Sequence, residues 1–142
     1  MKVSVREIAK SEACAAAEIE KACLSTCWSE HQIASLPENA VYLAVFDGAT
    51  MCGIASMYCV FEEGQIMNVA VSENYRGNGL ADVLMQALIL RAIDRKCERI
   101  TLEVAENNIP AIKLYEKHGF VAVGKRKGFY KNTDGIVMEK LL

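Results

Sequence analysis

The sequence of 142 residues, of which 52% are hydrophobic and 24% charged, is long enough to build one domain, residues 1–142, around a sizeable core. Sixteen Lys and Arg against eighteen Asp and Glu give a formal charge of −2, which argues against the basic character that drives direct nucleic-acid binding. No stretch approaches the ~18 apolar residues of a membrane span and the N-terminus lacks a signal-peptide pattern, so we expect a cytoplasmic protein without membrane contact.

The six cysteines fall inside apolar periodic segments and lack the regular spacing of a disulfide scaffold. We expect most of them to be small buried hydrophobic residues. They are Cys14, Cys23, Cys27, Cys52, Cys59 and Cys97. No C-x-x-C pair occurs, and the two histidines, His31 and His118, lie far apart in the sequence, so no metal site is expected.

Four segments of the N-terminal half have the alternating or apolar pattern of β-strands. They are residues 3–8, 41–46, 51–60 and 65–71. Residues 11–23 form a predicted alanine-rich helix with Ser11 as a possible N-cap, and Ser29 is a candidate cap for a second short helix. The turn sequences DGAT and EEGQ join the last three strands, which indicates antiparallel neighbours.

The C-terminal half contains a predicted helix over residues 80–96, whose apolar residues recur with helical spacing and leave Asp82 for solvent. Four further segments follow: a strand at 99–104, a helix at 109–118 that ends before Gly119, and strands at 120–127 and 135–140. The strand-helix-strand order in the middle predicts a parallel pair, and the hairpins on either side predict antiparallel pairs. A mixed sheet covered by helices is therefore expected.

Residues 68–88, NVAVSENYRGNGLADVLMQAL, place two glycines between a strand and a helix. The first amides of a helix have no intrahelical partner, and glycines at 77 and 79 remove the Cβ atoms that would keep a ligand away. A diphosphate would fit there, because a helix N-terminus carries partial positive charge. An ordinary strand-to-helix turn is the alternative. A dinucleotide-binding loop lacks its third glycine, since Asp82 stands there, and no Gly-Lys-Ser/Thr of a Walker loop follows.

The stretch Arg76-Gly77-Asn78-Gly79-Leu80-Ala81 resembles the Arg/Gln-x-x-Gly-x-Gly/Ala signature of the GCN5-related N-acetyltransferase (GNAT) family. The resemblance extends over nearly the whole chain and includes the segment LEVAENNIPAIKLYEKHGF. It implies a single GNAT acetyltransferase domain over residues 1–142. The implied fold is mixed α/β, with a mostly antiparallel central sheet of about seven strands that contains a parallel central pair and is flanked by about four helices.

The resemblance also implies that acetyl-CoA is the cosubstrate. It assigns the diphosphate to the glycine loop, the pantetheine arm to strand backbone, and a further contact to the helix start at Asn108. The residues so assigned are Val69, Ala70, Val71, Arg76, Gly77, Asn78, Gly79, Leu80, Ala81, Asp82 and Asn108. The stretch CWSE at 27–30 and the second block most resemble ribosomal-protein-alanine N-acetyltransferases of the RimI type. Transfer of acetyl to the N-terminal α-amine of a small-subunit ribosomal protein is the implied reaction.

Glu103 lies near the end of a predicted strand, where alternation sends Leu102 and Val104 to the opposite face, so its carboxylate could point out of the core. A carboxylate there is a plausible base for an α-ammonium, and the resemblance assigns Glu103 this role. Asn108 and Tyr115 share one face of a helix. The resemblance makes Tyr115 the acid that protonates the departing thiolate, since Tyr keeps its proton at neutral pH. The alternatives are a surface glutamate or ion-pair partner, and a core tyrosine with an N-cap asparagine.

The acceptor side is less defined by the sequence. Trp28 and Glu30 could line it, and in the hairpin GKRKGFYKNTDG we interpret the basic residues as a solvated face, with Tyr130 as a possible groove residue. A covalent route through cysteine is not favoured, because no flanking motif lowers a thiol pKa. The acceptor could instead be a small-molecule amine such as an amino acid, polyamine or drug-like amine. A module that binds acyl-CoA without transfer is a further alternative. The oligomeric state is left open.

Overall fold

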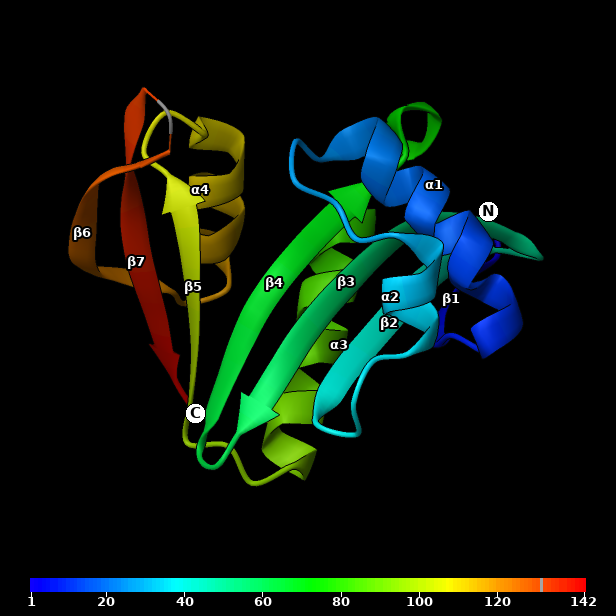
Figure 1. The fold of residues 1–142 in the computed structure, drawn as a ribbon, viewed down its shortest axis with the longest axis horizontal. Helices are drawn as coiled ribbons and strands as arrows, with labels where there is room; N and C mark the ends of the chain where they lie inside the picture. The colour runs from blue at the N-terminus through cyan, green and yellow to red at the C-terminus, as the bar shows by residue number, and fades with distance from the viewer. Residues whose placement is uncertain (131) are drawn as a thin grey trace.

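The computed structural model describes residues 1–130 and 132–142, and of residue 130 only the backbone. Seven strands form one sheet in the order β1-β2-β3-β4-β5-β7-β6 (Figure 1). The strands are β1 (Val3–Glu7), β2 (Ala40–Asp47), β3 (Thr50–Val60), β4 (Glu63–Val71), β5 (Arg99–Ala105), β6 (Val121–Tyr130) and β7 (Thr133–Leu141). The helices are α1 (Ala13–Cys23), α2 (Glu30–Ala34), α3 (Leu80–Asp94) and α4 (Ile109–Lys117), with short 3-10 turns at Lys10–Glu12 and Glu73–Tyr75. The mixed, mostly antiparallel sheet with one parallel pair, β4 with β5, confirms the predicted fold.

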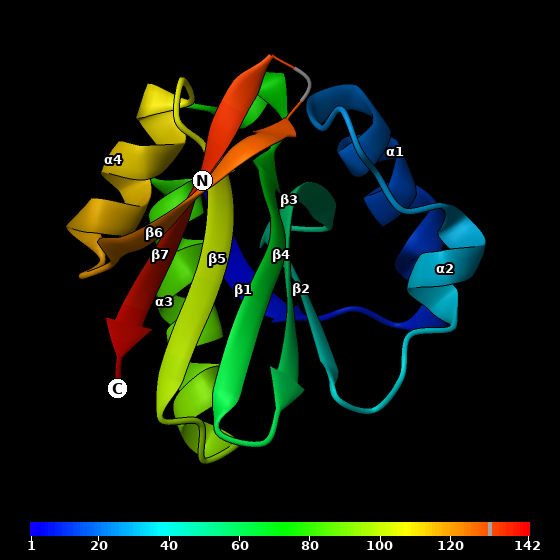
Figure 2. The same ribbon diagram turned by 60° about the vertical axis from the view of Figure 1, so that its left-hand side comes forward.

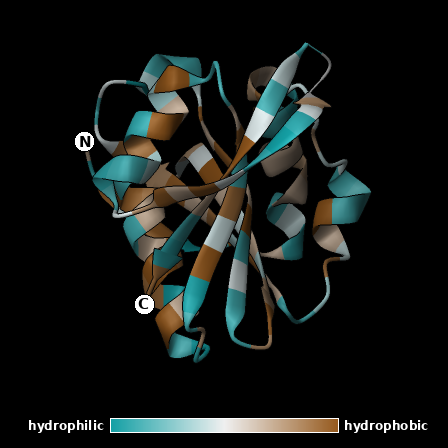
Figure 3. Cartoon of the chain, turned by 90° about the vertical axis from the view of Figure 1, so that its left-hand side faces the viewer, coloured by the Kyte–Doolittle hydropathy of each residue, from teal (hydrophilic) through white to brown (hydrophobic). Residues whose placement is uncertain are grey.

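Helices cover both faces of this sheet: α1 and α2 lie on one face, and α3 and α4 lie on the other (Figure 2). Alternation along the strands supplies both cores, as β2 illustrates. On β2, Leu43 packs in the α3 core and Tyr42 packs in the α1 and α2 core. Figure 3 shows hydrophobic and hydrophilic residues alternating along the strands at the β5, β6 and β7 end of the sheet.

Strands β4 and β5 pair over a short distance and then separate (Figure 1). Their parallel pairing runs only from Glu63 with Arg99 to Gln65 with Thr101. On its other edge β4 stays paired with β3, but the register shifts so that Met67 is an extra residue between Ile66 and Asn68. A bulge of this kind bends and twists a strand, and the extra residue moves the following side chains to the other face. The second half of β4 is therefore left with a free edge toward β5.

Several local predictions are confirmed. Ser29 caps α2: its Oγ accepts from the Gln32 amide (3.2 Å), and its own amide donates to Gln32 Oε1 (2.8 Å). Helix α4 ends before Gly119, which takes φ +91°, a left-handed conformation that favours glycine.

The helix predicted over 80–96 is shorter at its end, because Lys96 takes φ +66° after α3 stops at Asp94.

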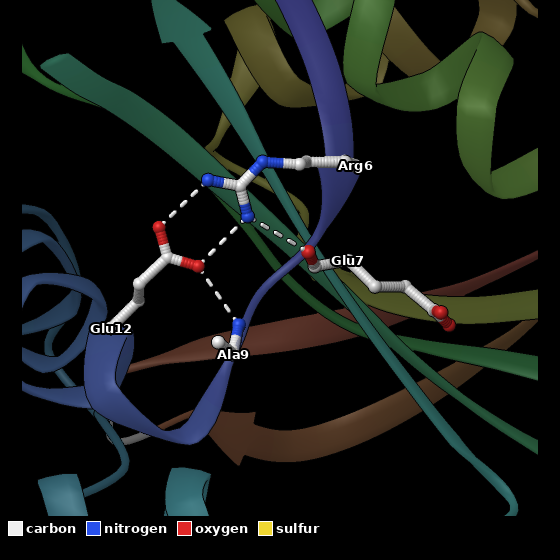
Figure 4. A network of polar contacts seen from close by, with 4 residues as sticks. All are labelled: Arg6, Glu7, Ala9 and Glu12. Carbon is white, nitrogen blue, oxygen red and sulfur yellow. Dashed lines mark hydrogen bonds and ion pairs between the residues drawn. The ribbon is translucent and has the colours of Figure 1, made fainter. Parts of the chain in front are cut away.

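The expected N-cap at Ser11 is wrong. Ser11 lies inside the 3-10 turn, and Glu12 fixes this corner instead (Figure 4). Glu12 accepts two hydrogen bonds from the Arg6 guanidinium (2.8 and 2.9 Å) and a third from the Ala9 amide (2.8 Å). The Arg6 guanidinium also lies over the Phe46 ring, 4.3 Å from its centroid. This network ties the start of α1 to β1 through partners only three and six residues from Glu12.

The cysteine prediction holds in part. All six cysteines are free thiols. Cys52 and Cys97 are buried and Cys23 and Cys59 are half-buried, as expected of small apolar residues. The other two, Cys14 and Cys27, are exposed on the α1 and α2 side. In the described part of the chain, no helix is both long enough and apolar enough to cross a membrane.

Candidate functional site

The glycine loop has the backbone conformation that its sequence predicts. Gly77 takes φ +80° and Gly79 takes φ +74°, both in the left-handed region that L-residues with a Cβ avoid. Between them, the Asn78 side-chain amide donates to the Tyr75 carbonyl oxygen (3.0 Å), which holds the loop closed on itself. An added Cβ at either glycine would meet no heavy atom within 4 Å, so the space beside the loop is open.

Helix α3 starts directly after this loop and presents unpaired amides. Its N-cap is Gly79, which has no side chain to accept a hydrogen bond, and the first helical bond runs from the Val83 amide to the Gly79 carbonyl (3.2 Å). The amides of Leu80, Ala81 and Asp82 therefore have no acceptor among the described residues. Three such donors together with the helix dipole favour an anion.

The free edge of β4 supplies further backbone groups. The Ser72 amide donates to Cys52 of β3 (2.8 Å), so by the two-residue alternation of an antiparallel strand the groups of Val71 and Val69 point away from β3. The Val71 carbonyl accordingly accepts from Arg76 Nε (3.0 Å) on the open side. Ala70 directs its backbone toward β3, where its oxygen lies 2.8 Å from the Cβ position of Gly53. Of the three predicted strand residues, two thus offer hydrogen bonds to the open side.

One cavity of about 680 Å³ joins these features, a size typical of cofactor sites. It lies at the open end of the gap between β4 and β5 and reaches the N-termini of α3 and α4. The predicted residues that line it are Val69, Ala70, Val71, Arg76, Gly77, Gly79, Leu80, Ala81, Asp82, Asn108 and Tyr115. Asn78 does not line the cavity, because its side chain turns back to the loop.

Helix α4 contributes one wall of the cavity. The Asn108 side chain caps it, because Oδ1 accepts from the Ala111 amide (3.3 Å), so the predicted cap role is confirmed. Tyr115 lies two turns further along, half-buried, with its ring edge-on to Phe120 at a centroid distance of 6.0 Å. Both residues line the cavity, as their spacing on the helix predicts.

Asp82 is not left to solvent as predicted. Its carboxylate lies 2.8 Å from His118 Nε2 and 3.0 Å from Lys117 Nζ, and 28% of the side chain is exposed. The hydrogen bonds from His118 and from Lys117 lower the pKa of Asp82. This cluster joins the first turn of α3 to the last turn of α4, so it fixes two walls of the cavity relative to each other. It also places the Lys117 ammonium beside the Asp82 carboxylate, which lies next to the unpaired amides.

Glu103 lies on the other face of the sheet from Tyr115. Leu102 and Val104 face the α3 core, and the side chain of Glu103 points to the α1 face, as alternation predicts. It lines a second hollow of about 470 Å³ together with Met67, a residue of the β4 bulge. The structure thus brings the acetyl-CoA candidates and Tyr115 into one cavity and places Glu103 in a neighbouring one, on the opposite side of the divided sheet.

Glu103 has two unequal oxygens. Oε1 lies 3.3 Å from Arg126 Nε, so the ion-pair alternative is confirmed. The sequence did not identify the partner, because β6 and β5 are brought together only through β7. Oε2 is buried and has no hydrogen-bond partner among the described residues. A buried oxygen without a donor is costly in a folded protein, and such groups are commonly functional. Glu103 is therefore suited to receive a donor from a ligand.

The basic hairpin is not simply a solvated face. Besides the Arg126 pair, Lys125 Nζ lies 3.0 Å from Glu106 and 3.5 Å from Asp134. The side chain of Tyr130, the possible groove residue, lies outside the described part of the chain. No cluster of three or more metal-ligating side chains occurs among the described residues.

The sequence reasoning did not place any residue of α1 or of the loop after it at the cavity. Cys23 and Leu24, at the end of α1, line the cavity. The Cys23 thiol donates to the Val71 carbonyl (3.6 Å) and accepts from Arg76 Nη2 (3.6 Å). No motif marks these residues, because only the packing of α1 against the end of β4 brings them there.

Comparison with known proteins gives a family match. The model of the Acetyltransferase (GNAT) family matches residues 5–120. The [ribosomal protein bS18]-alanine N-acetyltransferase of Escherichia coli (strain K12) is 33% identical over 122 residues, which cover 85% of this chain and 82% of that protein.

Solved structures give the same result. The crystal structure of the ribosomal-protein-S18-alanine N-acetyltransferase from Escherichia coli superposes with a TM-score of 0.90 at 28% identity, covering 98% of this chain and 93% of that one. Arabidopsis thaliana NAA60, crystallised in complex with acetyl-CoA, has the same fold, with a TM-score of 0.89 at 18% identity and 99% of each chain covered.

Proposed function

The chain belongs to the Acetyltransferase (GNAT) family, and from this premise we propose that it transfers acetyl from acetyl-CoA to the N-terminal α-amine of a ribosomal protein. One observation carries the proposal: a single cavity of about 680 Å³ joins the unpaired amides of α3, the free edge of β4 and Tyr115. A long thioester carrier with an anionic diphosphate needs these three features in one place. The coarser activity, that of a GNAT-type N-acetyltransferase, follows from the relatives themselves.

The seating of acetyl-CoA follows from the backbone. The amides of Leu80, Ala81 and Asp82 bind the diphosphate, and the left-handed glycines keep side chains out of its way. The pantetheine arm runs along the free edge of β4 and hydrogen-bonds the cleft-facing groups of Val69 and Val71. The arm then occupies the place of a strand between β4 and β5. This accounts for the separation of the two strands.

The amine approaches from the other side of the divided sheet. Glu103 Oε2, buried and without a partner, accepts a proton from the acceptor ammonium, directly or through a water. The Arg126 guanidinium, with Nε 3.3 Å from Oε1, holds the carboxyl group in place and leaves Oε2 as the oxygen that faces the amine. The neutral amine then attacks the thioester carbonyl carbon in a ternary complex.

Collapse of the tetrahedral adduct completes the transfer. The new C–N bond is retained and the C–S bond breaks. The attacking nitrogen releases its second proton to water, from which Tyr115 is later reprotonated, and the departing thiolate needs a proton. Tyr115 lines the coenzyme cavity and supplies this proton from its hydroxyl group. A strand amide of Val69 or Val71 stabilises the oxyanion. Acid and base on opposite faces of the sheet suit a reaction in which nucleophile and leaving group occupy opposite sides of one carbonyl.

The acceptor is tested with the purified chain, acetyl-CoA and a panel of amines, scored by product mass. A peptide copying the N-terminus of ribosomal protein bS18 from the same organism is expected to gain one acetyl group at its α-amine. The matched control is the same peptide with a blocked α-amine and its lysines intact, which is expected to gain none. Acetylation confined to amino acids, polyamines or drug-like amines would overturn the ribosomal acceptor, and coenzyme binding without any product would leave an acyl-CoA-binding module.

A further inference from the structure

Glu20 of α1 is completely buried, with 0% of its surface exposed. No Lys, Arg or His of the described residues forms an ion pair with it. Its carboxyl oxygens are instead filled by three neutral donors. The Trp28 amide donates to Oε1 (2.9 Å), the Asn68 side-chain amide donates to the same oxygen (3.4 Å), and the Tyr42 hydroxyl donates to Oε2 (2.5 Å).

A carboxyl group costs stability to bury unless its oxygens are hydrogen-bonded, as those of Glu20 are. The three donors come from three separate elements: the loop after α1, strand β2 and strand β4. Burial and the bond to Glu20 raise the pKa of Tyr42, so its hydroxyl keeps its proton and remains a donor. Glu20 is therefore a fixed junction between these elements.

The loop after α1 is closed at both ends by this one residue. The Leu24 amide donates to the backbone carbonyl of Glu20 (2.8 Å), and the Trp28 amide donates to its side chain. Leu24 lines the coenzyme cavity at one end of the loop. At the other end the Trp28 ring packs on Tyr42 and Tyr58, at centroid distances of 6.3 and 5.9 Å.

The third bond reaches the dividing point of the sheet. Asn68 follows the bulge residue Met67, which lines the hollow of Glu103, and precedes Val69, which lines the coenzyme cavity. Glu20 thus holds the short stretch of β4 that separates the proposed base from the proposed thioester. A shift of this stretch would move both hollows relative to each other.

We propose that Glu20 is a positioning residue for the acceptor: through Trp28 and Asn68 it fixes the loop of residues 24–28 and the β4 bulge as the wall along which the amine reaches the thioester. The inference rests on the proposed acetyl transfer but not on the identity of the acceptor. It predicts an effect on acceptor use that is separate from diphosphate binding, because the hydrogen bonds of the Glu20 carboxyl group go to Trp28, Tyr42 and Asn68 and none goes to the first turn of α3.

The test compares Glu20→Gln with Glu12→Gln. Gln has nearly the same shape but puts an amide in place of one carboxyl oxygen. Either the Tyr42 hydroxyl must reverse its bond and accept from this amide, or the Trp28 and Asn68 donors lose their acceptor. Glu12 is the matched control, since its carboxylate also fixes α1 by three hydrogen bonds but lies at the far end of that helix (Figure 4). The readouts are kcat, KM for each substrate, the thermal unfolding midpoint, and the emission of Trp28, the only tryptophan in the chain.

For Glu20→Gln we expect the acceptor KM to rise by up to about tenfold, the size of one lost hydrogen bond, with the acetyl-CoA KM within about twofold. The emission of Trp28 shifts to longer wavelength as the loop loosens. Glu12→Gln lowers the unfolding midpoint but leaves the acceptor KM and the emission unchanged. A Glu20→Gln enzyme that loses only thermal stability would overturn the proposal.

A second variant keeps the test decisive if Glu20→Gln does not fold. Tyr42→Phe removes one donor and keeps the ring against Trp28, so a smaller rise in acceptor KM is expected, and an unchanged value would overturn the proposal. Failure of the proposed function is seen separately, in the wild-type enzyme. If that enzyme acetylates a small amine instead of the peptide, the acceptor KM is measured with that amine.

Discussion

Replacing Gly79 by Ala tests the proposed anion site most directly. Gly79 takes φ +74°, and a Cβ added there meets no protein atom within 4 Å. The change therefore has two separable effects. Holding an L-residue in the left-handed region costs about 1–2 kcal/mol of folding stability. The new methyl group also lies in the open space beside the unpaired amides of α3, where the diphosphate would bind.

The expected loss of affinity follows from the bonds that the methyl group displaces. A hydrogen bond to a charged group contributes about 1.5–3 kcal/mol, so losing one weakens acetyl-CoA binding by about 10- to 150-fold. Backbone strain alone would not weaken binding, because it is present in both the free and the bound protein. Calorimetric titration with acetyl-CoA measures the dissociation constant, and thermal unfolding measures the strain.

The chain contains a matched control for the strain. Gly48, in the turn between β2 and β3, takes φ +60° and also has no heavy atom within 4 Å of its Cβ position. Gly48→Ala is expected to lose a similar amount of stability and to keep wild-type affinity. If Gly79→Ala binds acetyl-CoA as tightly as Gly48→Ala does, the amides of α3 do not seat the diphosphate and the mechanism built on them is wrong.

Three further predictions address the acid, the base and the stability of the fold. Glu103→Gln lowers kcat at least about 10²-fold, the usual contribution of a general base, with acetyl-CoA affinity unchanged, whereas Glu106→Gln on the nearby surface retains activity in the same assay. Tyr115→Phe slows the thioester-cleavage step seen as release of free thiol, and a wild-type rate of release would exclude Tyr115 as the acid. The hydrogen bonds from Arg6 lower the pKa of Glu12 from 4.5 to about 2. The contribution of Glu12 to stability is therefore present above the unfolded-state pKa and lost as the pH falls toward 2. Wild type is expected to be more stable than Glu12→Gln by about 0.2–1 kcal/mol in urea unfolding at neutral pH, and this difference should close as the pH falls.

The sequence determined the features that depend on neighbours in the chain. Gly77 and Gly79 fix a left-handed loop because only glycine adopts that backbone without strain, and the loop must then expose the amides of the following helix. Asn108 caps α4 through the amide of Ala111, three residues on. The alternation of β5 sends Glu103 away from the core for the same local reason. Each of these follows from the period of a helix or strand.

Local reasoning failed for more than one reason. Ser11 looked like a cap, but its neighbour Glu12 holds that corner through Arg6, a partner only six residues away, so the error lay in the choice between two adjacent polar residues. Asp82 looked exposed, but α4 brings His118 to it across 36 residues. Two of the cysteines, Cys14 and Cys27, sit on apolar patterns and are nevertheless exposed.

The tertiary structure alone decided how the site is divided. The bulge at Met67 and the short pairing of β4 with β5 open the sheet, and no local pattern encodes a gap between two strands. That gap places Glu103 and Tyr115 on opposite faces. Tertiary packing also supplies the partners of Glu20, a carboxyl group in an apolar helix face. Its three donors come from segments 8, 22 and 48 residues away. Sequence periodicity sets which way a side chain points, but what it meets there depends on packing between distant segments.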